Sequence, residues 1–100
     1  MILFEWDEAK AESNRRKHGI SFDYAAEAFY DPFAIYEQDR VVGGEERWQV
    51  IGVSEAVALL VVVHLIREEG ADEVVRIISA RRANRTEQRR YGKNHQKDQG

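Results

Sequence analysis

The sequence contains no cysteine and only one proline. Without cysteine the chain can form no disulfide, no thiolate-ligated zinc site and no cysteine nucleophile. Its longest apolar run covers residues 56–63, far fewer than the roughly 20 residues that cross a membrane. The first residues lack a basic stretch followed by a long apolar run, so we expect no signal peptide there. We therefore predict a soluble, cytoplasmic protein without a membrane partner.

Positive charge is scarce in the first eighty residues and concentrated in the last twenty. Residues 81–100 carry seven Lys and Arg against two acids, whereas residues 1–80 carry eight against sixteen. The formal net charge of the whole chain is -3. A local excess of basic side chains raises the affinity for phosphate where it lies, whatever the total charge. The last residues are therefore a candidate nucleic-acid surface on an acidic protein.

The chain is long enough for one domain with a modest hydrophobic core. Its 100 residues are 43% hydrophobic and include ten aromatic side chains, a composition typical of a folded domain. We predict a single domain over residues 1–92. Residues 93–100, which are polar and rich in Gln and Lys, are predicted to form a flexible tail.

The first third of the sequence predicts a short strand followed by two helices. Asp7 suits the N-cap of the first helix, and Gly19 suits the left-handed residue after its last turn. Ser21 can cap the second helix. Asp31-Pro32 ends that helix because proline disfavours helical geometry in the residue before it. The predicted ranges are 2–6 for the strand, 8–18 for the first helix, and from 22 onward for the second.

The rest of the sequence predicts four strands and a last helix. The connections are too short for crossover helices, so the strands should form an antiparallel meander. Asn84 and Glu87 predict a capping box at the start of the last helix, and Gly92 predicts its end. The strands are predicted at 33–37, 47–54, 56–66 and 73–80, the third being central. The fold class is therefore α+β, with helices packed on an antiparallel sheet and a basic C-terminal helix.

Arginine is the dominant side chain around the start of this last helix. Arg85 and Arg89 are four residues apart and share a helix face. Guanidinium groups bind phosphate in a two-point manner, and a fixed cluster can stabilise charge that develops at phosphorus. A solvated helix without a ligand explains the pattern equally well. The set comprises Arg81, Arg82, Arg85, Arg89 and Arg90, followed by Tyr91.

Two other groups of residues could transfer protons. Lys17 and His18 lie at the end of the first helix, and histidine exchanges protons near neutral pH. The alternative is a helix end at which His18 contacts its own carbonyl groups. Glu46 and Arg47 could serve as base and phosphate clamp at the start of a strand. Adjacent strand residues point to opposite faces, however, so a charge pair at a turn is the alternative.

His64 and Arg76 lie within apolar strands. A histidine in such a strand is more often a hydrogen-bonded core residue than a ligand, and Arg76 should meet a carboxylate or emerge on an open face. We find no residues at metal-ligand spacing, no glycine-rich phosphate loop and no serine nucleophile motif, and we therefore expect no metal or other cofactor.

Several short motifs follow one another along the chain. They are Phe4-Glu5-Trp6-Asp7, Asn14 with Lys17-His18-Gly19-Ile20, Phe29 before Asp31-Pro32, Glu46-Arg47, Gly52, and Arg76-Ile77-Ile78-Ser79-Ala80-Arg81 with Tyr91. As an ordered set from Phe4 to Tyr91, they resemble the BrnT family of bacterial type II toxins. The resemblance implies a RelE-like fold and a metal-independent endoribonuclease that cleaves RNA and inhibits translation.

The resemblance also implies partners. The expected partner is a BrnA-type ribbon-helix-helix antitoxin that neutralises the toxin and dimerises, giving a toxin–antitoxin heterotetramer. Operator DNA would be contacted only indirectly, through the antitoxin. The alternative function is a non-catalytic co-repressor or assembly module that acts through this DNA-binding partner.

For a ribonuclease of this kind the chain offers a defined set of residues. Lys17, His18 and Glu46 are candidates for proton transfer, and Arg47 and Arg81 for stabilising charge. Tyr91 could orient a phosphate or stack on a base. RNA-binding side chains are expected at Arg82, Arg85, Arg89 and Arg90.

Overall fold

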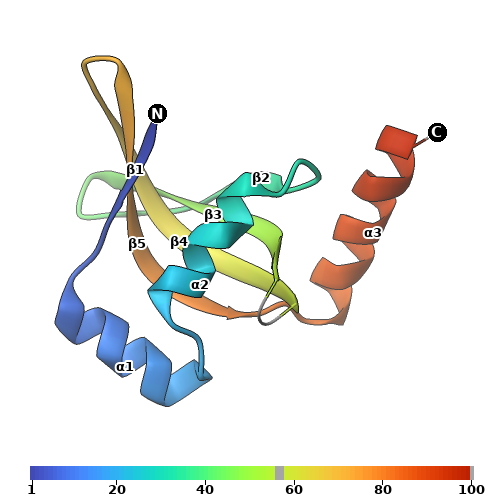
Figure 1. Ribbon diagram of the computed structural model, residues 1–100, viewed down its shortest axis with the longest axis horizontal. Coiled ribbons are helices and arrows are strands. Elements are labelled where there is room, and N and C mark those ends of the chain that lie inside the picture. Colours follow the sequence, from blue (N-terminus) through green and yellow to red (C-terminus); the bar gives the residue numbers. More distant parts are fainter. Residues whose placement is uncertain (56–57, 100) are drawn as a thin grey trace.

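A computed structural model describes residues 1–55 and 58–99 of the chain (Figure 1). The elements follow in the order β1 (Ile2–Glu5), α1 (Glu8–His18), α2 (Phe22–Glu27), the 3-10 turn η1 (Ala28–Tyr30), β2 (Ile35–Val42), β3 (Glu45–Ser54), β4 (Ala58–Glu69), β5 (Asp72–Arg82) and α3 (Arg85–Gln99). This is the α+β order that the sequence predicts. The predicted start of the third meander strand, residue 56, lies outside the described residues.

One five-stranded sheet organises the molecule, with strand order β1-β5-β4-β3-β2. Strands β2 to β5 are joined as antiparallel neighbours, which confirms the predicted meander and the central place of β4. Strand β1 pairs in parallel with β5, from Ile2 opposite Glu73 to Glu5 opposite Arg76. The sequence predicts the strand but not this pairing, because its partner lies about seventy residues further along the chain.

Local capping residues fix the ends of the first two helices. The side chain of Asp7 accepts a hydrogen bond from the Lys10 amide at 3.0 Å, and Gly19 adopts a left-handed φ of 74° after α1. The Ser21 hydroxyl accepts from the Tyr24 amide at 3.2 Å. These contacts satisfy amide groups that a helix leaves without partners at its start. All three predicted capping positions are confirmed.

The main core lies between one face of the sheet and the layer formed by α1, α2 and η1. Phe22 and Ile20 are buried there against apolar residues from the central strands. Burying a side chain of this size contributes roughly 1.5–3 kcal/mol. A smaller cluster of Ile51, Val61 and Ala83 occupies the opposite face, where Tyr91 of α3 packs against it. The sheet therefore separates α1 and α2 from α3.

A β-bulge in β5 sets which side chains reach which face. Val63 of β4 lies opposite Ser79, but the next residue, His64, lies opposite Ile77, so β5 contains one extra residue. As a result Ile77 and Ala80 both enter the main core. Because side chains alternate along a strand, Arg82 follows Ala80 onto the face of α1. Arg81 is on the face of α3.

The last helix differs from the prediction at its C-terminal end. It continues through Gly92, where the sequence predicts its end, and reaches Gln99. Glycine inside a helix costs only about 1 kcal/mol relative to alanine, so tertiary contacts can carry the helix past it. One such contact is the hydrogen bond from the Asn94 side chain to the Phe33 carbonyl, at 2.9 Å. The predicted boundary between domain and tail at residue 92 stays a prediction.

Within the described part of the chain, no helix has the length and apolar character needed to span a membrane.

Candidate active site

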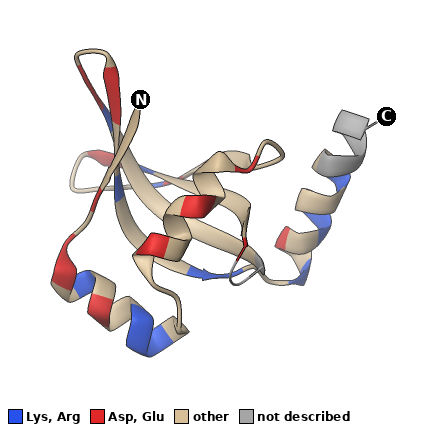
Figure 2. Cartoon of the chain, viewed as in Figure 1, with Lys and Arg blue, Asp and Glu red and all other residues tan. Residues whose placement is uncertain are grey.

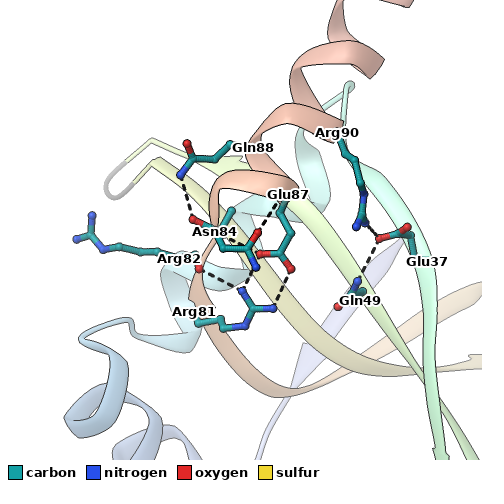
Figure 3. Close-up of polar contacts among 9 residues, drawn as sticks. Glu37, Gln49, Arg81, Arg82, Asn84, Glu87, Gln88 and Arg90 are labelled. Carbon is teal, nitrogen blue, oxygen red and sulfur yellow. Dashed lines mark hydrogen bonds and ion pairs between the residues drawn. The ribbon is translucent and has the colours of Figure 1, made fainter.

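Arg81 and Glu87 form the centre of a polar cluster where β5 leads into α3 (Figure 3). Both terminal nitrogens of Arg81 donate to the Glu87 carboxylate, Nη1 to Oε1 at 2.8 Å and Nη2 to Oε2 at 2.9 Å. The side chain of Arg81 is 41% exposed, whereas that of Glu87 is 9% exposed. The hydrogen bonds from Arg81 hold the pKa of the Glu87 carboxyl below its usual value. The carboxylate is thus an anchored anion beneath a guanidinium that reaches solvent.

Glu87 also belongs to the capping box that the sequence predicts. Its Oε1 accepts from the Asn84 amide at 2.8 Å, and the Asn84 side chain accepts from the Glu87 amide at 2.9 Å. Gln88 adds a hydrogen bond to the Ala83 carbonyl at 3.0 Å. These contacts confirm the capping box and fix the first turn of α3 next to the end of β5.

Further along α3, Arg90 forms an ion pair with Glu37 of β2 (Figure 3). The same carboxylate accepts a hydrogen bond from Gln49 of β3 at 3.1 Å. The sequence predicts Arg90 as an RNA-binding residue, and the structure gives it a partner carboxylate within the chain. It therefore connects α3 to the sheet.

Tyr91 connects the same helix to the segment after η1. Its hydroxyl donates to Asp31 Oδ2 at 2.7 Å, and this oxygen also accepts from the Val53 amide at 2.9 Å. Burial, followed by the hydrogen bond to Asp31, raises the pKa of Tyr91 above its ordinary value. The phenol is therefore held in its neutral form as a hydrogen-bond donor.

The remaining arginines of the predicted set are exposed. Arg82, Arg85 and Arg89 all lie at the surface of the β5–α3 junction or of α3 itself. Figure 2 shows basic residues along α3 and at the adjoining end of β5, whereas many acidic residues lie in the hairpins distant from α3. The uneven charge of the sequence thus becomes an uneven charge in space, with a basic end formed around α3.

Lys17 and His18 are exposed in the last turn of α1. They lie one turn beyond Asn14, which is buried and bonds to the backbone of Ala80 in β5. This contact fixes α1 against the end of β5. The two candidate proton-transfer residues are consequently on the side of the sheet that carries Arg82, not on the side that carries Arg81.

Glu46 and Arg47 lie at the start of β3, so their side chains alternate between faces. Glu46 lines a hollow of about 410 Å³ with Trp48 and Arg76. Arg47 is half-buried, and its Nε is buried without a hydrogen-bond partner among the described residues. Because β3 already includes both residues, Glu46 and Arg47 point to opposite faces and do not line one pocket together.

The fold accounts for both His64 and Arg76. His64 is fully buried, its ring packs edge-on against Phe29, and burial lowers its pKa. Its Nδ1 contacts the Val62 carbonyl at 3.1 Å, as expected for a hydrogen-bonded core histidine, while its Nε2 has no partner in the described part of the chain. Arg76 donates to Glu5 at 2.9 Å, which confirms the predicted carboxylate partner.

The predicted catalytic residues therefore fall into three parts of the molecule. These are the end of α1 with Lys17 and His18, the start of β3 with Glu46 and Arg47, and the β5–α3 junction with Arg81 and Tyr91. In the described ranges, 1–55 and 58–99, no group of three or more His, Asp or Glu side chains is arranged to hold a metal ion.

Sequence reasoning missed Asp31 and Glu37 as site residues, and it identified Glu87 only as a helix cap. Asp31 and Glu37 hold Tyr91 and Arg90, and Glu87 holds Arg81 as well as capping α3. Glu87 carried a signal, because it is the only acid among the first residues of a basic helix. Asp31 and Glu37 carried none, since their partners are more than fifty residues away.

The family model of the ribonuclease toxin BrnT, of type II toxin–antitoxin systems, matches residues 6–87. The chain belongs to the BrnT family. Among solved structures it is similar to the Brucella abortus ribonuclease toxin BrnT, with 26% identity and a TM-score of 0.57. This similarity covers 85% of the present chain and 99% of the Brucella chain. No curated protein matches the sequence.

Membership of the family gives the chain its general role. BrnT proteins are ribonuclease toxins of type II toxin–antitoxin systems, so this chain is such a toxin and has an antitoxin as its partner. The matched range includes α1, α2, the whole sheet except β1, and the start of α3. It therefore contains the Arg81–Glu87 pair as well as Lys17 and Glu46.

Proposed function

We propose that this BrnT toxin is a metal-independent endoribonuclease that acts in the cytoplasm and inhibits translation by cleaving RNA. The observation that carries the proposal is the basic surface at the β5–α3 junction, where Arg81 is anchored and Arg82, Arg85 and Arg89 are exposed. A basic surface of this kind binds the RNA backbone through phosphate contacts.

The proposed reaction is internal transesterification of the RNA backbone. The ribose 2′ oxygen forms a bond to the adjacent phosphorus while the bond from phosphorus to the 5′ oxygen breaks. A base accepts the proton of the 2′ hydroxyl, an acid supplies a proton to the 5′ oxygen, and cationic groups stabilise the charge at phosphorus. The products are a 2′,3′-cyclic phosphate and a 5′ hydroxyl, with no external oxidant, reductant or nucleophile consumed.

The candidate residues divide these tasks. Lys17, His18 or Glu46 would move protons, and Arg47 and Arg81 would stabilise charge. Arg81 of β5 pairs with Val61 of β4, which in turn pairs with Ile51 of β3. Ile51 is four residues from Arg47 along β3, so the two arginines are separated by about 13 Å along the strand direction. They would therefore contact different phosphates of one strand. Tyr91 would hold α3 beside the site through its hydrogen bond to Asp31, and its ring would stack on a base at the edge of the site.

We further propose that the antitoxin is of the BrnA type, a dimeric ribbon-helix-helix protein, and that two toxins bind to it in a heterotetramer. Operator DNA would then be bound only through the antitoxin. The proposal rests on the family, in which a toxin and an antitoxin form the system. Mass measurement of the complex purified from cells that express both proteins tests the stoichiometry.

Purified toxin, freed of antitoxin, should cleave end-labelled RNA in the presence of EDTA. Arg81→Ala should abolish cleavage, while Arg40→Ala, at an exposed position of β2 outside the predicted RNA-binding set, should leave it intact. The products should carry cyclic phosphate and 5′ hydroxyl ends. Cleavage that EDTA stops and a divalent cation restores would overturn metal independence. A folded protein that cuts neither free nor ribosome-bound RNA, yet strengthens repression with its antitoxin, would favour the co-repressor role.

A further inference from the structure

The guanidinium of Arg81 has two edges, and only one of them is occupied by the described residues. A guanidinium carries five N–H donors in a rigid plane. Nη1 uses both of its donors, on Glu87 Oε1 at 2.8 Å and on the Arg82 carbonyl at 3.3 Å. Nη2 uses one, on Glu87 Oε2. The remaining donors are the Nε–H and the second N–H of Nη2, which lie side by side on the other edge.

This second edge has no hydrogen-bond acceptor in the described part of the chain. The Arg81 side chain is 41% exposed. Two parallel N–H groups on one edge match the spacing of two oxygens of a phosphate. Figure 3 shows the terminal nitrogens of Arg81 turned toward Glu87. The occupied edge is thus the inner one, and the free edge is available to a ligand.

We infer that Glu87 is a positioning residue, which fixes Arg81 so that its free edge binds a phosphodiester of the RNA through two parallel hydrogen bonds. The inference rests on the proposed function and adds to it a defined phosphate contact and the residue that sets its geometry. Glu87 does not touch the RNA. It acts by holding the guanidinium plane in one orientation before the substrate arrives, which lowers the cost of ordering a flexible side chain.

The burial of Glu87 explains why an incoming phosphate does not displace it. Its side chain is only 9% exposed, and its carboxylate also accepts the Asn84 amide at 2.8 Å. Removing it from Arg81 would leave a nearly buried charge poorly compensated, which is costly. A phosphate therefore adds to the free edge. The exposed Arg82 and Arg85 supply the net positive charge that the Arg81–Glu87 pair itself lacks.

A direct test observes the Arg81 Nε–H by nuclear magnetic resonance in the whole toxin. The signal is assigned by its loss in Arg81→Lys. A short RNA with 2′-O-methyl groups, which cannot be cleaved, should shift the Arg81 signal in a saturable way and leave that of Arg40 in place. RNA that binds and shifts other arginine signals, but not that of Arg81, overturns the phosphate contact. This readout needs no catalysis, so it decides the contact even if the toxin proves inactive.

A kinetic test separates positioning from simple support of the fold. Glu87→Gln should lower kcat by about tenfold to 100-fold with a smaller change in KM, because the guanidinium loses its fixed orientation. Arg81→Lys, which keeps the charge but has no fork, should lower kcat by about 100-fold or more. Asn84→Ala is the matched control, since it weakens the same helix cap without removing a contact to Arg81.

The outcomes separate the phosphate contact from the ribonuclease activity itself. Loss of activity in Glu87→Gln, with Asn84→Ala active at a comparable Tm, supports positioning. Equal activity losses in the two variants reduce Glu87 to a capping residue and overturn the inference while the ribonuclease stands. Should Glu87→Gln not fold, Arg81→Lys provides the test. Full activity in that variant would contradict phosphate binding through two parallel hydrogen bonds from Arg81. A wild-type toxin without any cleavage instead overturns the proposed function.

Discussion

Asn14 and Ala80, 66 positions apart, are joined by two hydrogen bonds that imitate a strand pair. The Asn14 amide nitrogen donates to the Ala80 carbonyl at 2.9 Å, and the Ala80 amide donates to Asn14 Oδ1 at 3.1 Å. Strand β1 pairs with β5 only as far as Arg76, so among the described strands none continues along the outer edge of β5 at Ala80. The carboxamide of Asn14 takes the place of the missing peptide group.

Replacing Asn14 with alanine should therefore destabilise the fold. The change leaves the buried amide and carbonyl of Ala80 without these partners, and also removes a hydrogen bond to the Ile20 carbonyl. We expect a loss of about 2–4 kcal/mol in the free energy of unfolding, since each buried unsatisfied group costs about 1–3 kcal/mol. Urea unfolding measures it. Ser13→Ala, on the exposed neighbouring position of α1, should change it by less than about 0.5 kcal/mol.

Acid should remove the contribution of Glu5. Hydrogen bonds from Arg67, and then from Arg76, lower the pKa of Glu5 from 4.5 to about 2. A carboxyl whose pKa is lower in the folded state than in the unfolded state stabilises the fold at pH values above its unfolded-state pKa. This contribution disappears as the pH falls through the folded-state pKa. The stability difference between wild type and Glu5→Gln should thus shrink between pH 4.5 and 2.

The same Glu5→Gln substitution in an Arg67→Gln background provides the control. Arg67 is the largest cause of the lowered pKa of Glu5. Without Arg67, the stability difference between the proteins with Glu5 and with Gln at this position should therefore depend less on pH. Urea unfolding of the four proteins at a series of pH values gives the comparison. An identical pH dependence with and without Arg67 would contradict the assignment of the shift to this arginine.

Loss of the Tyr91 hydroxyl should loosen α3. Tyr91→Phe removes the hydrogen bond to Asp31, and we expect the free energy of unfolding at neutral pH to fall by about 1 kcal/mol. Because the pKa of Tyr91 is raised from 10.0, the hydroxyl stabilises the fold below that value. The contribution is lost as the pH rises through the folded pKa, so the two proteins should converge in alkaline solution. Tyr30→Phe, at a position 66% exposed, should leave the free energy of unfolding unchanged at neutral and at alkaline pH.

Two glycines should respond oppositely to alanine. A Cβ at Gly52 would lie 2.6 Å from the Ala28 carbonyl oxygen and 3.1 Å from its Cβ, so η1 would have to move off the sheet. We expect Gly52→Ala to cost about 1–3 kcal/mol. A Cβ at Gly92 meets nothing within 4 Å among the described residues, and Gly92→Ala should stabilise α3 by about 0.5–1 kcal/mol. Thermal unfolding of the two variants distinguishes them, and a stabilised Gly52→Ala would contradict the close contact.

RNA binding should weaken as salt rises. The slope of log affinity against log salt has a magnitude of about 0.7 for each phosphate of a single strand that the protein neutralises. Arg85→Ala and Arg89→Ala should each make the slope less steep by about that amount, measured with the 2′-O-methyl RNA. Arg40→Ala should leave it unchanged. A slope that is flat in the wild type would contradict phosphate binding at α3.

Local chemistry made much of the fold predictable. Asp7, Gly19 and Ser21 act within a few residues of themselves, and their predicted roles at helix ends are confirmed. The capping box of Asn84 and Glu87 is confirmed for the same reason. The boundaries of the strands are less accurate: β4 extends to Glu69 and β5 to Arg82. A hairpin gains these residues by pairing, which the sequence of one strand does not record.

Long-range contacts made the rest unpredictable. The parallel pairing of β1 with β5 and the continuation of α3 past Gly92 both depend on partners that are distant in sequence. The candidate site shows the same division. Arg81 stands out in the sequence by itself, but the carboxylate that orients it is recognisable there only as a cap, and the partner of Arg90 is not recognisable at all.

The bulge in β5 gives this strand a change of phase. Between Ile77 and Ala80 the alternation of side chains between the two faces of the sheet shifts by one residue. Every later side chain of β5 therefore lies on the face opposite to the one it would occupy in a strand without a bulge. If Ile78 instead paired within the ladder, without a bulge, Arg81 would take the place opposite Leu60 that Arg82 now holds. The arginine next to Glu87 would then turn toward α1. A single inserted residue thus decides which of two identical neighbours faces the last helix.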